Sequence, residues 1–269
     1  MTQDVWLTNY PYLRPLAELQ AVTDSVMDEI AVPSADIPIW EDYFEVFVAG
    51  TPLLRSNRVE IDFRPLEDAV VPLVQKLLSQ HLTEKLHQQC QSLVTELGNK
   101  PGAPLHSVTW LLDKNTLSTS QPGLLQYLGW SLLVRYLSRL LPVFANWRDE
   151  ERWLRTYCPA CGSAPAMAQL VGIDPGRLRL LSCGRCNTRW RYRRTQCPFC
   201  ESDEHRLAGF SVEGSPLRID YCEACGGYIK TYNGEGSETV LLADSMSIHL
   251  DILACDLGLK RFAGSLYQF

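Results

Sequence analysis

Four Cys-x-x-Cys pairs lie within one stretch of the sequence, and this stretch decides the fold. They read CPAC (Cys158–Cys161), CGRC (Cys183–Cys186), CPFC (Cys197–Cys200) and CEAC (Cys222–Cys225). Adding 39 to the residue numbers of the first two pairs gives the residue numbers of the last two pairs. The same shift relates Leu178-Arg179-Leu180 to Leu217-Arg218-Ile219. The stretch is therefore a duplicated unit, recognised by its long period.

Each half of the duplication holds four cysteines, which is the ligand set of a tetrahedral metal site. We predict one zinc or iron ion per half, because both metals accept four thiolates. Four sulfurs at about 2.3 Å leave no open coordination position, which favours a structural or electron-transfer site over a hydrolytic one. Sequential pairing is favoured because a duplicated unit should hold an ion by itself, but interleaved pairing stays open. The predicted ligands are Cys158, Cys161, Cys183 and Cys186 in one half and Cys197, Cys200, Cys222 and Cys225 in the other.

The residue after each second cysteine is a further test of the turn. A left-handed backbone is expected there, which glycine adopts without strain and asparagine with little. Gly162, Asn187 and Gly226 meet this expectation, whereas Glu201 does not.

Composition places the chain among ordinary globular proteins. Of its 269 residues 46% are apolar and 21% are charged, values typical of that class. The start, MTQDVWLTNYPYL, lacks the pattern of a secretory signal. The most apolar stretch, residues 124–144, contains Arg135 and Arg139 and is interpreted as a core helix without membrane insertion. We therefore expect a cytoplasmic protein, in which cysteines bind metal more often than they form disulfides.

Charge is distributed unevenly along the chain. Residues 151–195 hold 9 Lys and Arg against 2 Asp and Glu, although the whole chain has a net charge of −6. Alternation in RWRYR (residues 189–193) predicts a strand with one charged and one apolar face. Its arginines could contact an acidic partner or remain solvated, and the acidic flanks argue against nucleic acid. The basic cluster consists of Arg185, Arg189, Arg191, Arg193 and Arg194.

The sequence predicts an α+β fold in four parts. Helical periodicity dominates residues 1–152, with helices expected at about 13–32, 36–50 and 121–143, and with Asp36 as the N-cap of the second. The run 65–97 predicts one long or two shorter helices. Two tandem rubredoxin-like or zinc-ribbon-like modules of four cysteines each follow at 153–194 and 195–236, with strands expected at 177–182 and 217–221. The segment 237–269 contains a C-terminal helix at about 244–257. Cys90 and Cys255 lie in helical runs and are interpreted as buried small apolar residues.

The cysteine region resembles the formate dehydrogenase accessory (formation) protein family, FdhE. The resemblance is carried by LRTYCPACGSAPAM (residues 154–167), the CGRCNTRW step (residues 183–190), YCEACGGYIKTY (residues 221–232) and LLADSMSIHLDILACDLGLKR (residues 241–261). It covers roughly residues 151–260. Lys230 matches a family position without an assigned role.

The resemblance implies a cytoplasmic maturation factor that binds the catalytic subunit of respiratory formate dehydrogenase and is not an enzyme. No nucleophile elbow, P-loop, dinucleotide-binding or metalloprotease motif occurs in the sequence. A homodimer stays open. Two other functions also stay open: a rubredoxin-like iron electron carrier and a zinc-ribbon nucleic-acid binder.

Overall fold

The computed structural model describes residues 7–8, 11–30, 34–99, 119–173, 176–212, 217–233 and 240–264. It divides into two compact units. One includes residues 39–59 together with most of 145–265, and the other includes most of 9–38 and 60–144. Among the described residues no helix is both long enough and apolar enough to span a membrane.

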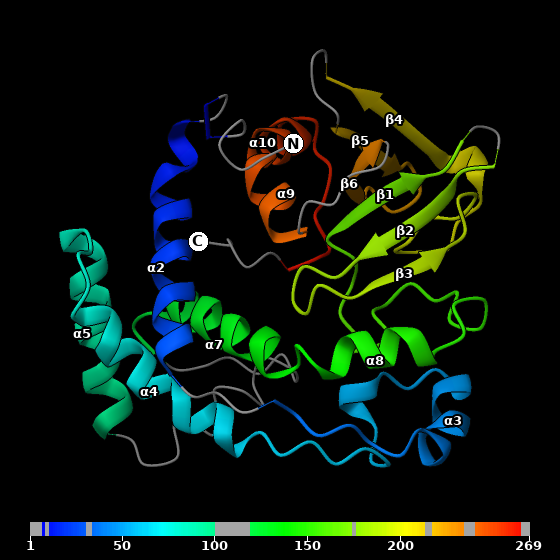
Figure 1. The fold of residues 1–269 in the computed structure, drawn as a ribbon. Coiled ribbons are helices and arrows are strands. Elements are labelled where there is room, and N and C mark those ends of the chain that lie inside the picture. Colours follow the sequence, from blue (N-terminus) through cyan, green and yellow to red (C-terminus); the bar gives the residue numbers. More distant parts are fainter. Residues whose placement is uncertain are drawn as a thin grey trace. The chain divides into compact units, whose positions relative to one another are not determined.

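The helical unit is built around α4 (Arg64–Leu78), which contacts α2 (Arg14–Glu29), α5 (Glu84–Asn99) and α7 (Pro122–Tyr136) (Figure 1). A short 3-10 turn, η1 (Pro11–Leu13), precedes α2. α4 contributes an apolar stripe at helical spacing, and burying such a stripe stabilises a helix more than its propensity does. The buried side chains of this stripe are Leu66, Val70, Leu73, Val74 and Leu77.

Two predicted helices of the N-terminal region differ in detail. The run 121–143 is divided into α7 and α8 (Leu140–Trp147). Pro142 explains the break, because proline cannot donate a hydrogen bond to the carbonyl of Ser138 and its ring clashes with that group. The predicted N-cap at Asp36 is wrong: α3 (Trp40–Ala49) begins after Pro38, whose ring disfavours a helical conformation at Ile37. The predicted end at Gly50 is confirmed, with φ of 94°.

The other unit contains one six-stranded sheet. Its strands are β1 (Met167–Val171), β2 (Leu178–Ser182), β3 (Arg189–Tyr192), β4 (Leu207–Ser211), β5 (Leu217–Cys222) and β6 (Tyr228–Asn233). Their order across the sheet is β3-β2-β1-β6-β5-β4 (Figure 1). Every neighbouring pair is antiparallel except β1 with β6, which is parallel. A 3-10 turn, η3 (Glu204–Arg206), leads into β4.

The sequence duplication is visible in this sheet. Under the shift of 39 residues β1, β2 and β3 overlay on β4, β5 and β6. Across the sheet, the third, second and first strands of the first module are therefore followed by the third, second and first strands of the second module. The parallel β1–β6 pair joins the modules head to tail into one continuous sheet.

Helices and a short turn complete the sheet unit. The predicted C-terminal helix is present and is divided at Ser247 into α9 (Val240–Met246) and α10 (Ile248–Asp256). Lys230 of β6, almost fully buried, binds Asp244 and Asp251 of these helices at 2.7 Å each. α3 and η2 (Leu53–Arg55) also belong to this unit, where Phe47 stacks on Trp153.

Candidate metal centres

All four Cys-x-x-Cys pairs form the same turn. In each turn the first cysteine donates its backbone N–H to the carbonyl five residues later and accepts, at its own carbonyl, the N–H of the residue four positions on. For Cys158 these bonds join Ser163 and Gly162 at 2.9 Å each, and for Cys197 they join Ser202 and Glu201 at 2.8 and 3.0 Å. The other two turns, at Cys183 and Cys222, repeat the pattern.

The left-handed residue expected after each second cysteine is found in all four turns. Its φ is 77° at Gly162, 58° at Asn187, 60° at Glu201 and 71° at Gly226. Glu201 therefore adopts the conformation for which its side chain is unsuited. The geometry of the turn outweighs the preference of the residue, because the turn is held by two backbone hydrogen bonds and by two sulfurs directed toward one site.

The structure brings the cysteines together in two groups that follow the sequential pairing. Cys158, Cys161, Cys183 and Cys186 form one group, and Cys197, Cys200, Cys222 and Cys225 form the other. Sulfur–sulfur distances are 3.5 Å for Cys158–Cys186 and 3.7 Å for Cys200–Cys222. A tetrahedral ion with bonds of about 2.3 Å requires sulfurs about 3.8 Å apart. Both groups therefore fit a metal ion with four thiolate ligands and are too widely spaced for disulfides.

Hydroxyl groups beside three of the turns were not singled out from the sequence. Ser163, Thr188 and Ser202 each lie two residues after a second cysteine, with oxygen–sulfur distances of 3.3, 3.2 and 3.1 Å. Once the sulfur is deprotonated, such a hydroxyl donates to it and stabilises the thiolate. The signal was present as Cys-x-x-Cys-x-Ser/Thr in three of the four pairs.

Burial opposes negative charge on the sulfurs of the first group. All four of its cysteines are buried, and burial raises the pKa of the Cys158 and Cys183 thiols well above their ordinary value. Thiols in such a place stay protonated unless a positive ion compensates for the lost hydration. A divalent or trivalent ion would supply that charge and hold the strands together.

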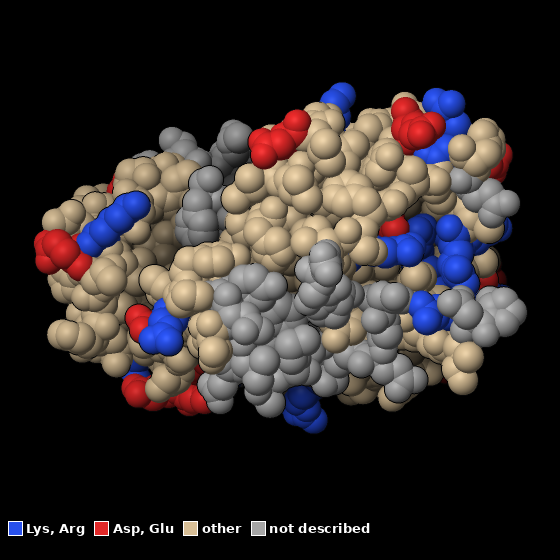
Figure 2. All heavy atoms as spheres, turned by 90° about the horizontal axis from the view of Figure 1, so that it is seen from above, with Lys and Arg blue, Asp and Glu red and all other residues tan. Residues whose placement is uncertain are grey.

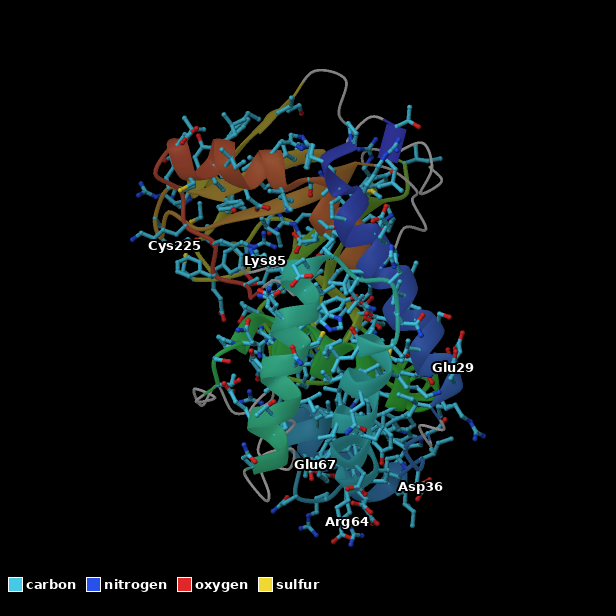
Figure 3. All side chains as sticks on the ribbon, turned by 90° about the vertical axis from the view of Figure 1, so that its left-hand side faces the viewer. Glu29, Asp36, Arg64, Glu67, Lys85 and Cys225 are labelled. Carbon is cyan, nitrogen blue, oxygen red and sulfur yellow. The ribbon has the colours of Figure 1, made fainter. Side chains whose placement is uncertain are left out.

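The second group is more open to solvent. Cys200 is exposed and Cys225 is half-buried, and Cys225 lies at the periphery of the side chains in Figure 3. A hydrogen bond from the Ser202 hydroxyl is the main cause that lowers the pKa of Cys200 to about 6. The first group owes its cover to η2, where the N–H groups of Leu53 and Leu54 donate to the carbonyls of its first turn at 2.9 and 2.8 Å.

The remaining candidates lie apart from both groups. Neither Cys90 nor Cys255 belongs to a metal-binding group among the described residues. The predicted burial is confirmed for Cys90 and is wrong for Cys255, which lies on the exposed side of α10. The predicted alternation of β3 is confirmed, since Trp190 and Tyr192 are buried between half-buried arginines. Of the basic cluster, Arg191 pairs with Glu151 and Arg193 bonds the Gln196 side chain at 3.2 Å.

The comparisons with known proteins agree with this architecture. A family model described as FdhE, central domain, matches residues 157–194. A curated FdhE homolog from Aquifex aeolicus is 29% identical over 78% of this chain and 71% of its own length. One from Shewanella baltica (strain OS185) is 26% identical over 94% of this chain and 90% of its own length. This chain is similar to FdhE proteins along most of its length.

The FdhE fold is also found in a solved structure. The crystal structure of the FdhE protein from Pseudomonas aeruginosa superposes with a TM-score of 0.65, covering 95% of this chain and 88% of the other at 22% identity. A curated FdhE homolog from that organism is 40% identical over a shorter region, 40% of this chain and 36% of its own length. The similarity in fold therefore extends over 95% of this chain.

Proposed function

We propose that this chain is a cytoplasmic accessory factor that binds the catalytic subunit of formate dehydrogenase while the active enzyme is formed. The observation that carries the proposal is similarity to an FdhE homolog over 94% of this chain, combined with two groups of four cysteines. Four protein ligands would leave an ion no position for substrate. We accordingly assign the chain a maturation role without catalysis of its own.

In this proposal all eight cysteines of the two groups are metal ligands, and each group holds one zinc or iron ion. The ion would fix the ends of neighbouring strands, because each group joins the turn that precedes a module's first strand to the turn between its second and third strands. The two ions thereby stabilise the surface that a partner meets. Such a role needs a rigid sheet, which the metal-free thiols do not provide.

Co-purification tests the proposed partner. A tagged chain expressed in its own host, grown under conditions that induce formate dehydrogenase, should recover the catalytic subunit. Deletion of the gene should abolish formate oxidation, and Cys158→Ser should reduce both signals. Cys255→Ser, which changes an exposed cysteine outside both groups, should leave both signals intact. Recovery of no subunit together with normal formate oxidation in the deletion strain would reject the proposal.

A rubredoxin-like electron carrier is the second candidate, and the exposure of Cys200 favours it. An iron site close to solvent exchanges electrons with a partner more readily than a deeply buried one. Protein purified without oxygen should then show iron–thiolate absorption and be reduced reversibly. Colourless protein with two zinc ions per chain would exclude this candidate.

A further inference from the structure

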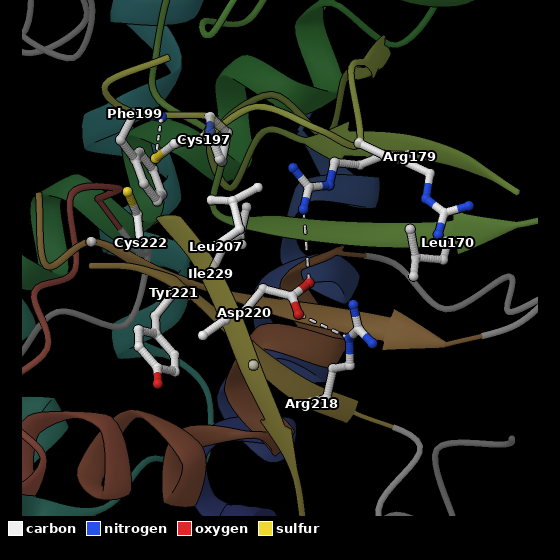
Figure 4. Close-up of a pocket in the computed structure, with 15 residues that line it drawn as sticks. Leu170, Arg179, Cys197, Phe199, Leu207, Arg218, Asp220, Tyr221, Cys222 and Ile229 are labelled. Atoms are coloured by element: carbon white, nitrogen blue, oxygen red, sulfur yellow. Dashed lines mark hydrogen bonds and ion pairs between the residues drawn. The ribbon is translucent and has the colours of Figure 1, made fainter. Parts of the chain in front are cut away.

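A pocket of about 310 Å³ opens on the sheet beside the second cysteine group (Figure 4). Residues of five strands, β1, β2, β4, β5 and β6, line it, so it spans the junction between the modules. Its charged residues are Arg179, Arg194, Arg218 and Asp220. Figure 2 shows lysine and arginine side chains gathered over the part of the surface that belongs to the sheet. The pocket therefore carries an excess of positive charge.

Two of these arginines are equivalent in the duplication. Arg179 of β2 and Arg218 of β5 are related by the shift of 39 residues. Both point toward Asp220 in Figure 4, with Arg218 Nε 2.9 Å from Oδ1 and Arg179 Nη2 3.9 Å from Oδ2. The counterpart of Asp220 in the first module is Leu181. Head-to-tail joining thus brings two arginines to one carboxylate.

Asp220 does not satisfy the guanidinium of Arg179. Its Oδ2 already accepts a hydrogen bond from Thr231 at 2.6 Å, and 3.9 Å is beyond hydrogen-bond distance. Arg179 is only 5% exposed. It donates from Nη1 to the carbonyls of Gln196 and Arg193 at 3.0 and 3.5 Å, while its Nε has no hydrogen-bond partner among the described residues. A buried N–H group without an acceptor destabilises the folded chain, and a ligand that accepts a hydrogen bond from the guanidinium would remove part of that cost.

Glycine keeps one wall of the pocket open. A Cβ at Gly209 of β4 would lie 2.7 Å from Oδ1 of Asp220 and 2.9 Å from the carbonyl of Ile219. Any larger residue would therefore displace the carboxylate that holds Arg218. The remaining walls include apolar side chains, namely Leu170, Phe199, Leu207 and Ile229.

We propose that this pocket binds a carboxylate group carried on an apolar stem. The planar guanidinium groups match a carboxylate, and the apolar walls match the stem. A dianionic phosphate is disfavoured relative to a monoanionic carboxylate, because it would bring a second negative charge next to Asp220. The carboxylate can come from a small organic acid or from a glutamate side chain of a bound peptide.

Calorimetric titration of the full metal-loaded chain distinguishes these ligands. Hexanoate is the small-acid probe, with acetate, hexanol and inorganic phosphate as comparisons. The peptide probe is acetyl-Leu-Glu-Leu-amide, compared with its Gln counterpart. Hexanoate binding would identify a small organic acid as the source, and binding of the Glu peptide alone would identify a peptide. In both cases the carboxylate ligand should bind at least tenfold more tightly than its uncharged analogue.

Variants link binding to the pocket. Arg218→Gln should weaken the binding of the carboxylate ligand at least tenfold, and Arg194→Gln, at an exposed position, should weaken it several-fold without affecting folding. Arg206→Gln removes the same charge from an exposed site that does not line the pocket and should change affinity less than twofold. Equal affinity for carboxylates and uncharged analogues, tighter binding of phosphate, or equal losses in Arg206→Gln and Arg194→Gln would overturn the proposal.

Discussion

Glu201 adopts a left-handed conformation that glycine or asparagine provides in the other three turns. This conformation costs a residue with a Cβ about 1–2 kcal/mol. We predict that Glu201→Gly stabilises the second module by about 0.5–1 kcal/mol, since the greater freedom of glycine in the unfolded chain offsets part of the gain. Denaturant unfolding of the metal-loaded chain measures it. Glu201→Gln keeps the strain and removes only the charge, so an equal gain in that control would contradict the explanation.

Glu67 of α4 is a buried carboxyl group in the helical unit, labelled in Figure 3. It is 3% exposed, and its Oε2 has no hydrogen-bond partner among the described residues. Burial, followed by the charges of Asp68 and Asp62, raises the pKa of Glu67 to about 7. Because the folded pKa exceeds the unfolded one, ionisation destabilises the unit at pH 8, and the loss disappears as the pH falls through 7 toward 4.5.

Replacing this group should therefore have a pH-dependent effect. Glu67→Gln is expected to raise the free energy of unfolding by about 1–3 kcal/mol at pH 8 and by little at pH 4.5. Thermal unfolding at both pH values measures the difference. Glu18→Gln, an exposed change in α2, should be neutral at both. A gain that does not depend on pH would show that ionisation of Glu67 is not its cause.

At the scale of elements, Lys230 attaches the α9–α10 pair to the sheet. Lys230 and Arg261 together neutralise the charges of Asp244 and Asp251. Arg261 lies 2.6 Å from Asp244 and 2.9 Å from Asp251. Burial opposes ionisation of Asp244, but the charges of Lys230 and Arg261 outweigh it and lower the pKa of this carboxyl. In this chain the contacts of Lys230 therefore connect β6 to the α9–α10 pair.

Lys230→Met should cost about 3–5 kcal/mol, because it leaves buried carboxylates with one cation for two charges. Denaturant unfolding should show this loss, and amide exchange in α9 and α10 should accelerate more than in β1 and β2. Adding Asp251→Asn should restore part of the stability, since it restores charge balance. A loss below about 1 kcal/mol would mean that the pair contributes little to helix attachment.

The two outer edges of the sheet differ in the hydrogen bonds that their backbones make. The outer edge of β3 is covered: Arg148 donates to the carbonyl of Arg189, and Glu150 accepts the N–H of Arg191 at 3.1 Å. The outer edge of β4 pairs with no strand of the described chain. By the 39-residue repeat, β3 corresponds to β6 and β4 corresponds to β1, and β1 pairs with β6 inside the sheet. If its cover were removed, the β3 edge of one copy could therefore pair with the β4 edge of a second copy in the same way.

Removal of the cover should therefore cause self-association. The double variant Arg148→Ala with Glu150→Ala is predicted to form head-to-tail oligomers whose mass increases with concentration, measured by sedimentation velocity. Asp149→Ala with Arg152→Ala removes the neighbouring exposed ion pair, at 2.9 Å, and should not change the mass. An unchanged mass in both double variants would show that these side chains do not control pairing at the β3 edge.

For the whole molecule, sequence reasoning succeeded where chemistry fixes spacing. Thiolate ligands at a metal tolerate few geometries, so the cysteine positions predicted groups that the structure brings together. The alternation of apolar residues in strands and their spacing in helices likewise predicted the corresponding elements. The continuous sheet could not be predicted, because pairing of β1 with β6 depends on backbone edges that leave no side-chain pattern. The association of 39–59 with the sheet unit depends on backbone donors of Leu53 and Leu54 and was hidden for the same reason.

This covering by η2 makes the two metal sites unequal, which the exact repeat of the sequence conceals. With one ion per group, a chelator should remove metal in two phases, the faster from the second group, where Cys200 is exposed. The release can be followed with a coloured chelator. Cys200→Ser should abolish the fast phase and retain the slow one. Cys158→Ser should remove the slow phase. It should also destabilise the sheet unit, because structural ions contribute much of the folding free energy of small domains. A single phase in the unmodified chain would contradict the unequal cover, and unchanged metal content in both variants would contradict the ligand assignment.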